Sequence, residues 1–130
     1  MASSTDRPGV ARVHRGLAFV ALAWGILQFF LAGYAAFGGS SFDAHAASGS
    51  FMGLLTLVIL VLAAVGRRSA LQASAVLFVL MIVQSILGGV GTDAPVLGAL
   101  HPVLGLLILG VASLAAAGRP VGPRGHRATA

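Results

Sequence analysis

The sequence predicts an all-α membrane protein, a transmembrane four-helix up-down bundle. Three observations predict it: 58% of the 130 residues are hydrophobic, only 8% are charged, and the apolar residues gather in long uninterrupted runs. Ordinary soluble domains are about 25% charged, and a soluble chain of this length cannot bury so much apolar surface. We therefore expect the lipid bilayer to be the partner that surrounds most of the chain.

The apolar runs are each about 22 residues long, close to the roughly 20 residues with which a helix crosses the hydrocarbon core. An isolated strand would leave backbone groups unpaired in lipid, so helices are the expected spanning elements. Short connections between them force neighbouring helices to run antiparallel. The sequence thus predicts polar tails at 1–15 and 119–130 and one domain over 16–118, with helices at about 16–37, 45–66, 69–90 and 96–118.

The basic residues predict how the bundle is oriented. All eight are arginine, and in this topology they fall on one side of the bilayer: Arg7, Arg12, Arg15, Arg67, Arg68, Arg119, Arg124 and Arg127. The positive-inside rule makes that side cytoplasmic, so we expect a multi-pass protein of a bacterial cell membrane with both termini in the cytoplasm. A cleaved signal peptide is the alternative for the first run, which is longer than a usual signal core. His14, among these arginines, is expected to be an interfacial anchor.

Composition also excludes several function classes. There is no cysteine, which excludes disulfides, thiolate catalysis and cysteine metal sites. The arginines form no stripe with interleaved aromatic residues, so nucleic acid is not an expected partner. No carboxylate lies within a predicted span, which argues against a small proton-coupled exporter. No phosphate-binding loop and no Ser/His/Asp set is present, so no catalytic residue is predicted.

A shift of 56 residues superposes the second half of the chain on the first without gaps. It pairs residue types that are rare in this sequence: Gln28 with Gln84, Gly33 with Gly89, His45 with His101, and Gly49 with Gly105. The pairing indicates two copies of a helix hairpin related by a pseudo-twofold axis along the membrane normal. Chance alignment in an apolar sequence is the alternative.

The two paired histidines are the candidate metal ligands. Each opens a predicted helix and is followed four residues later by a glycine, Gly49 or Gly105, which lies on the same helix face. A ligating histidine with a glycine one turn below it suits a flat macrocycle that lies edge-on between helices. A helix N-terminus disfavours imidazolium and keeps the ring neutral. The pattern therefore predicts His45 and His101 as axial ligands of one haem b, whereas the alternative makes both of them hydrogen-bonding anchors at the interface.

The histidines need not lie at one depth. His45 is 22 residues before Arg67, whereas His101 is 18 residues before Arg119. If both arginines mark one level, the histidines differ by about 6 Å along the membrane normal at ~1.5 Å per residue. Helix tilt would have to absorb this difference.

Gln28 and Gln84 lie beyond the middle of the first and third predicted helices, toward the outer side. Such amides stabilise membrane bundles by hydrogen bonding to a neighbouring helix. The alternative role is contact with the edge of a cofactor or with a nitrogen of a ligating histidine. Both glutamines are therefore candidate cofactor-binding residues.

Four helices with axial histidines on the second and fourth resemble half of a haem A synthase, which is a tandem of two such bundles. The likeness covers residues 12–118 and is carried by His45 and His101 with their following glycines. It implies that these histidines bind one haem near the outer face. The chain departs from the pattern in its half length, in the lack of loop cysteines, and in having Asp43 as the nearest acid before His45. It also resembles small integral membrane proteins of high-GC actinobacteria whose function is not established.

These observations together predict a small b-type cytochrome that moves electrons or handles haem near the outer face, beside a respiratory or redox membrane partner that the sequence does not name. The alternative is a haem-free structural or accessory subunit, in which faces of small residues pack the helices together.

Overall fold

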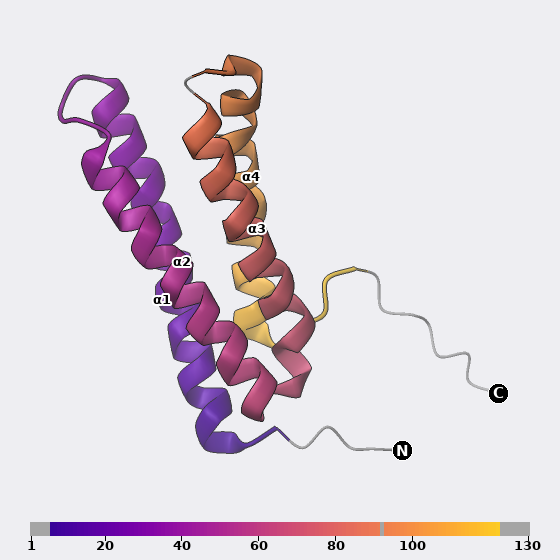
Figure 1. The fold of residues 1–130 in the computed structure, drawn as a ribbon. Coiled ribbons are helices and arrows are strands. Elements are labelled where there is room, and N and C mark those ends of the chain that lie inside the picture. Colours follow the sequence, from indigo (N-terminus) through magenta and orange to yellow (C-terminus); the bar gives the residue numbers. More distant parts are fainter. Residues whose placement is uncertain (1–5, 92, 123–130) are drawn as a thin grey trace.

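The structure, a computed structural model, describes residues 6–91 and 93–122. Over these residues the chain forms four long helices and a 3-10 turn, in the order α1 Pro8–Ala36, α2 Asp43–Gly66, η1 Arg68–Ala70, α3 Leu71–Val90 and α4 Pro95–Ala117 (Figure 1). Each long helix is apolar enough to cross a membrane. The predicted all-α up-down bundle is confirmed, and the chain is a multi-pass membrane protein.

The first helix begins earlier than predicted. It starts at Pro8 rather than near residue 16, so about half of the predicted N-terminal tail is helical. Proline favours the first helical position because its φ angle is already helical and its missing N–H would have no partner there. The other helix ends fall within a few residues of the prediction. Arg124 and Arg127, which belong to the predicted C-terminal tail, lie outside the described residues.

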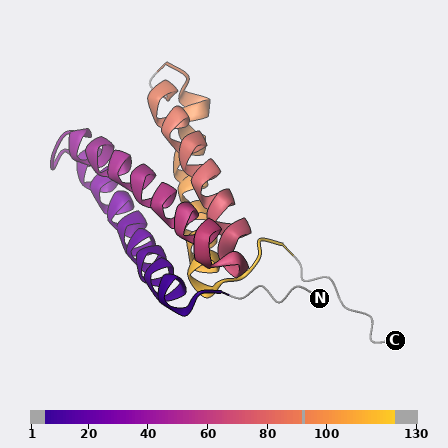
Figure 2. The same ribbon diagram turned by 60° about the horizontal axis from the view of Figure 1, so that its bottom comes forward.

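The four helices pack at the corners of a square. Helix α1 packs against α2 and α4, and α3 packs against the same two helices, whereas the diagonal pairs make no such contact among the described residues. The two hairpins, α1–α2 and α3–α4, meet at the end that carries the termini and splay apart toward their turns, as both views show (Figures 1 and 2). We call these the termini end and the cavity end of the bundle.

Apolar side chains hold the hairpins together in the middle of the bundle. Leu55, Ile59, Leu77, Ile108 and Ala112 belong to one buried cluster that draws on α2, α3 and α4, and Ala21 adds α1 to it. In lipid the packing of such complementary surfaces, rather than escape from water, favours association of helices. This cluster fixes the point from which the hairpins diverge.

A buried arginine ties all four helices together at the termini end. The side chain of Arg67 is only 6% exposed. Its Nη1 donates to His14 Nδ1 (2.7 Å) and to the carbonyl of Ala115 (3.2 Å), and its Nη2 donates to the carbonyl of Ala116 (2.9 Å). These carbonyls lie in the last turn of α4, where a cation is favoured by the helix dipole. The guanidinium thus serves as the cap that the end of α4 needs.

His14 completes this cluster and corrects the expectation that it is an interfacial anchor. The residue is fully buried. Because Nδ1 accepts the bond from Arg67, the ring proton is on Nε2, which donates to Ser74 Oγ on α3 at 2.9 Å. His14 is therefore part of the packed bundle interior.

The N-terminal segment crosses the same end of the bundle. The backbone N–H of Arg7 donates to the carbonyl of Gly66 at 2.8 Å. The Asp6 carboxylate accepts bonds from the backbone N–H of Ser69 (3.2 Å) and from Ser69 Oγ (2.5 Å). Chiefly because Ser69 Oγ donates to the charged form, the pKa of the Asp6 carboxyl is lowered from its ordinary value. Asp6 thereby caps the start of η1 from a distant part of the chain.

Candidate cofactor cavity

A cavity of about 1070 Å³ lies between the two hairpins at the cavity end. Its size is slightly above the roughly 300–1,000 Å³ that is usual for small-molecule and cofactor sites. All the predicted site residues line it: His45, His101, Gly49, Gly105, Gln28 and Gln84. The splay of the hairpins therefore brings the candidate residues of the sequence to one space.

The rings of the two histidines lie close together in this space. The centres of their rings are 5.9 Å apart, and the ring planes are inclined by 64°. The depth difference of about 6 Å that the arginine spacing suggests therefore does not keep the two rings apart. The histidines thus come from diagonally opposite helices and meet near the bundle axis.

Each histidine is tethered to the other helix of its own hairpin. His45 Nδ1 lies 3.1 Å from the backbone carbonyl oxygen of Gln28, and His101 Nδ1 lies 3.0 Å from that of Gln84. A carbonyl oxygen can only accept, so both Nδ1 atoms carry the proton and donate it. The lone pair of each neutral ring is then on Nε2, the nitrogen that is free to bind a metal.

The predicted repeat also relates the contacts beneath the histidines. A Cβ atom added to Gly49 would lie 3.7 Å from Gln28 Nε2, and one added to Gly105 would lie 3.6 Å from Gln84 Nε2. In each hairpin, therefore, the glutamine amide packs against the glycine that follows the histidine by one turn. The shift of 56 residues that pairs these residues in the sequence also pairs their positions around the cavity.

The two halves differ in the residues around this shared frame. A Cβ added to Gly88 would lie 3.1 Å from His101 Cε1, whereas the matching residue beside His45 is Ala32. Gln28 Nε2 donates to Ser48 Oγ at 2.9 Å, and position 104, which corresponds to Ser48, is leucine. The cavity is thus symmetric in its histidines and asymmetric in its walls.

Two polar atoms of the cavity have no partner within the described part of the protein. Gln28 Oε1 and Gln84 Oε1 are both buried and accept no hydrogen bond. A buried acceptor without a partner costs about 1–3 kcal/mol. Both atoms lie on residues that line the cavity, so they favour an occupant or ordered water with donor groups over a lipid tail alone.

The donor set is unsuited to a bare tetrahedral ion. Among residues 6–91 and 93–122, no group of three or more His, Cys, Asp or Glu side chains could hold a metal. A structural zinc site takes four protein ligands, whereas here two imidazoles face each other alone. A metal–nitrogen bond of about 2 Å would place two opposed imidazole centres about 6 Å apart, and the observed separation is 5.9 Å. The residues present therefore fit a metal whose other ligands come from a macrocycle.

Some cavity residues were not anticipated from the sequence. Phe42 places the edge of its ring toward His45, with 6.3 Å between ring centres. Met52 and Met81 are buried members of the apolar cluster that also line the cavity. Met52 could have been found from its spacing, because it follows His45 by seven residues and so lies two turns along the same face. Phe42 lies in the turn before α2, and helical spacing gives no information there.

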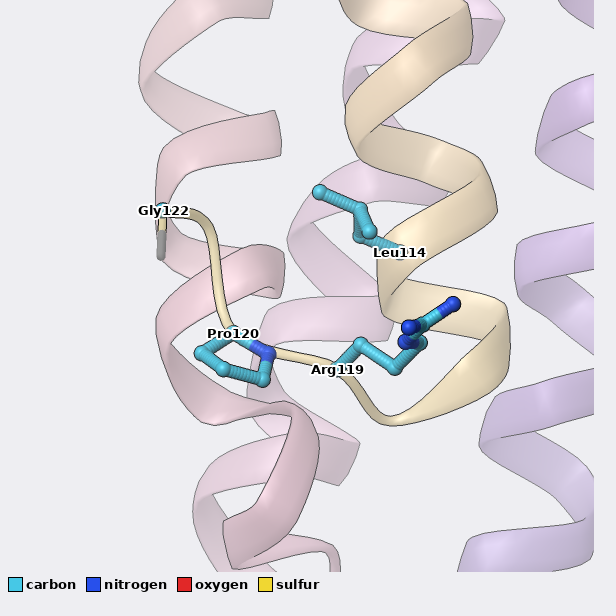
Figure 3. Close-up of a pocket in the computed structure, with 4 residues that line it drawn as sticks. All are labelled: Leu114, Arg119, Pro120 and Gly122. Atoms are coloured by element: carbon cyan, nitrogen blue, oxygen red, sulfur yellow. The ribbon is translucent and has the colours of Figure 1, made fainter. Parts of the chain in front are cut away.

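A second, smaller pocket lies at the opposite end. It has a volume of about 330 Å³ and is lined by Leu114, Arg119, Pro120 and Gly122 (Figure 3). Its one charged group is the exposed guanidinium of Arg119. No histidine of the described residues lines this pocket, in contrast to the cavity between the hairpins.

Comparison with models of protein families gives a match over part of the chain. The model of a protein family of unknown function (DUF6220) matches residues 28–91. The matched segment includes Gln28, His45 and Gly49 from the first hairpin and Gln84 from α3, and it ends before His101. No curated protein and no solved structure shows significant similarity to the chain. The chain is thus a multi-pass membrane protein that over residues 28–91 is similar to a family of unknown function.

Proposed function

We propose that this protein is a small b-type cytochrome that holds one haem b between His45 and His101, for electron transfer or for haem handling. The observation that carries the proposal is the opposed pair of imidazoles with ring centres 5.9 Å apart, each tethered through Nδ1 to a backbone carbonyl. Histidines that bind metals usually donate their other ring N–H in this way, which fixes the tautomer and the ring orientation.

The walls of the cavity support this assignment. Gly49 and Gly105 lie one turn below the histidines and place no side chain in the cavity. The space beside Gly49 is bounded by the amide of Gln28, whereas the ring of Phe29 packs against Gly105. The diagonal placement of α2 and α4 lets one imidazole approach from each face. When bound, haem iron supplies one-electron redox chemistry, and the chain's own residues supply the two axial nitrogens and an apolar surround.

The arginines support an orientation for the site. The described arginines belong to the N-terminal part of α1, to the α2–α3 turn or to the segment after α4, all at the termini end, whereas the turns at the cavity end carry Asp43 and Asp93. By the positive-inside rule the termini end is cytoplasmic, so the haem site lies near the outer face of a bacterial cell membrane. A redox partner would then approach from the outer side or within the bilayer.

An absorption spectrum of the purified protein tests the proposal. Protein from haem-replete cells should show the bands of a low-spin ferrous haem after reduction. The double variant His45→Ala/His101→Ala should lose them, and the matched control His126→Ala, in the C-terminal tail outside the described residues, should keep them. A colourless wild-type protein would leave the alternative, a haem-free accessory subunit in which the histidines only tie each hairpin together.

A further inference from the structure

The two candidate ligands are placed differently along their helices. His45 is in the first turn of α2, which begins at Asp43, whereas His101 is in the second turn of α4, which begins at Pro95. Helix ends open more readily than helix interiors, because their last turns have fewer backbone hydrogen bonds. By position alone, the backbone that carries His45 opens more easily.

The surroundings of the rings differ in the same sense. The ring of His101 packs directly on the backbone of Gly88, since a Cβ added there would lie 3.1 Å from its Cε1 atom. The aromatic neighbour of His45 is Phe42, which is itself 55% exposed. Both rings donate to a backbone carbonyl, but His101 also packs on a backbone surface, whereas His45 lies beside a half-exposed side chain.

The turns that lead into the two helices also differ. The α3–α4 turn is closed by backbone contact, because a Cβ added to Gly98 would lie 2.9 Å from the carbonyl oxygen of Gly91. The α1–α2 turn is longer, and Phe37 at its start is 94% exposed. Pro102 removes one backbone donor from α4, yet the helix is unbroken from Pro95 to Ala117, and the contact with Gly91 braces its first turn.

We propose that His101 is the permanent axial ligand and His45 the exchangeable one, and that the position which His45 vacates binds a neutral diatomic molecule. This inference rests on the proposed haem site. Opening of the first turn of α2 would carry His45 Nε2 out of the cavity, while His101 would stay on its Gly88 surface. The protein then has a ligand-binding position on the α2 side of the cavity.

The charges around the cavity specify a neutral ligand. Asp43 and Asp93 are the charged residues of the cavity end in the described chain, and both are acidic. The described arginines all belong to the opposite end, beyond the reach of an anion in the cavity. Both carboxylates are exposed and neither lines the cavity, and no described arginine lines it either. An anion would therefore lose its hydration in the cavity without a cation to compensate, so carbon monoxide should enter more readily than azide.

The experiment uses the reduced holoprotein and carbon monoxide as the probe. Wild-type protein should form a carbon monoxide complex in its absorption spectrum. Azide should bind the oxidised form at least about tenfold more weakly than it binds a histidine-ligated control haem protein that has an arginine beside the haem. His45→Ala should keep haem and bind carbon monoxide faster, and His101→Ala should lose haem. Two results would overturn the ligand assignment but leave the proposed haem site standing. One is a haem-containing wild type that forms no carbon monoxide complex, and the other is equal haem loss in His45→Ala and His101→Ala. A colourless wild type overturns the haem site as well.

A second pair of variants keeps the test independent of ligand removal. Ala44→Gly loosens the first turn of α2 next to His45, and Ala99→Gly loosens the second turn of α4 two residues before His101; both alanines are exposed. Glycine in place of alanine destabilises a helical turn enough to raise the fraction of molecules in which that turn is open about fivefold. The association rate of carbon monoxide should rise about fivefold in Ala44→Gly and stay unchanged in Ala99→Gly. Equal rates in the two variants, or a faster rate only in Ala99→Gly, would contradict the assignment of His45 as the mobile ligand.

Discussion

Arg67 donates a hydrogen bond from Nη1 to His14 Nδ1 over 2.7 Å, and this bond joins the α2–α3 turn to α1 inside the termini end. The same guanidinium caps the carbonyls of α4, and His14 in turn bonds Ser74 on α3. The two hairpins are therefore held together at one end by a polar cluster and separate at the other around the cavity.

Loss of this cluster should destabilise the bundle. In Arg67→Met the carbonyls of Ala115 and Ala116 and the Nδ1 atom of His14 lose their donor, so we expect a loss of about 2–4 kcal/mol in the free energy of unfolding. Thermal or denaturant unfolding in detergent micelles measures it. Arg68→Met removes an exposed neighbour and should change stability by less than about 0.5 kcal/mol. Equal effects of the two substitutions would show that the cluster contributes nothing.

Asp6 should make stability depend on acid pH. Its pKa is lowered in the folded protein because Ser69 donates to the carboxylate, so its contribution is present above the unfolded pKa of about 3.9 and disappears as the pH falls through the lower folded value. Asp6 is only partly buried, so solvent screening limits the effect to about 1 kcal/mol or less. Asp6→Asn should lower stability at pH 7 and match the wild type near pH 2. A variant that differs from the wild type by the same amount at both pH values would refute this role.

A side chain placed at Gly49 should block the cavity without unfolding the bundle. Gly49 lines the cavity, and a Cβ there would meet the amide of Gln28, whereas a Cβ at Gly53, one turn further along α2, would meet open space. We expect Gly49→Leu to lower the haem content of purified protein at least about tenfold, as disturbed metal sites commonly do. Gly53→Leu should keep it. The ratio of haem absorbance to protein absorbance measures the haem content of each variant. Unfolding curves check that both variants are folded.

The lack of cysteine makes the orientation directly measurable. Ser41 lies exposed in the turn before α2, and Arg68 lies exposed in the turn after it. With Ser41→Cys, a membrane-impermeant maleimide should label intact cells after the outer membrane, if present, is opened. Arg68→Cys should react only after the cytoplasmic membrane is permeabilised. The reverse pattern would place the cavity on the cytoplasmic side and contradict the positive-inside inference.

Much of the fold follows from the sequence because lipid allows few solutions. Four apolar runs of spanning length and short connections leave an antiparallel bundle as the simple arrangement, and the structure has it. The start of α1 at Pro8 was missed because the polar residues that follow were assigned to a tail, although they continue the helix beyond the apolar run. Length and polarity alone do not show where a spanning helix continues into the interface.

The interior of the termini end could not be predicted for a related reason. Arg67 was interpreted as one of several interfacial arginines, since the sequence does not show that the last carbonyls of α4 lack partners and come within its reach. His14 likewise has no counterpart in the repeat, where position 70 is alanine. The roles of both residues depend on contacts between segments more than 45 residues apart.

The site was predicted as a set of residues, and the structure places all six around one cavity. Their function as haem ligands stays a prediction. What the sequence could not show is the splay of the hairpins, which depends on which apolar residues pack in the cluster below. The sequence also could not show that each histidine bonds to the backbone carbonyl of a glutamine. Nor could it show that the side-chain amide oxygens of both glutamines have no hydrogen-bond partner among the described residues.

The use of the main chain at positions 28 and 84 has a consequence for tracing this site through evolution. A carbonyl oxygen is common to every amino acid, so the proton on each imidazole stays where it is under any replacement of the glutamine that preserves the helix. The partner that orients each histidine is therefore invisible to comparisons of amino-acid identity. Distant relatives could share the same imidazole geometry while showing only two isolated histidines, 56 positions apart, in otherwise unrecognisable apolar sequence.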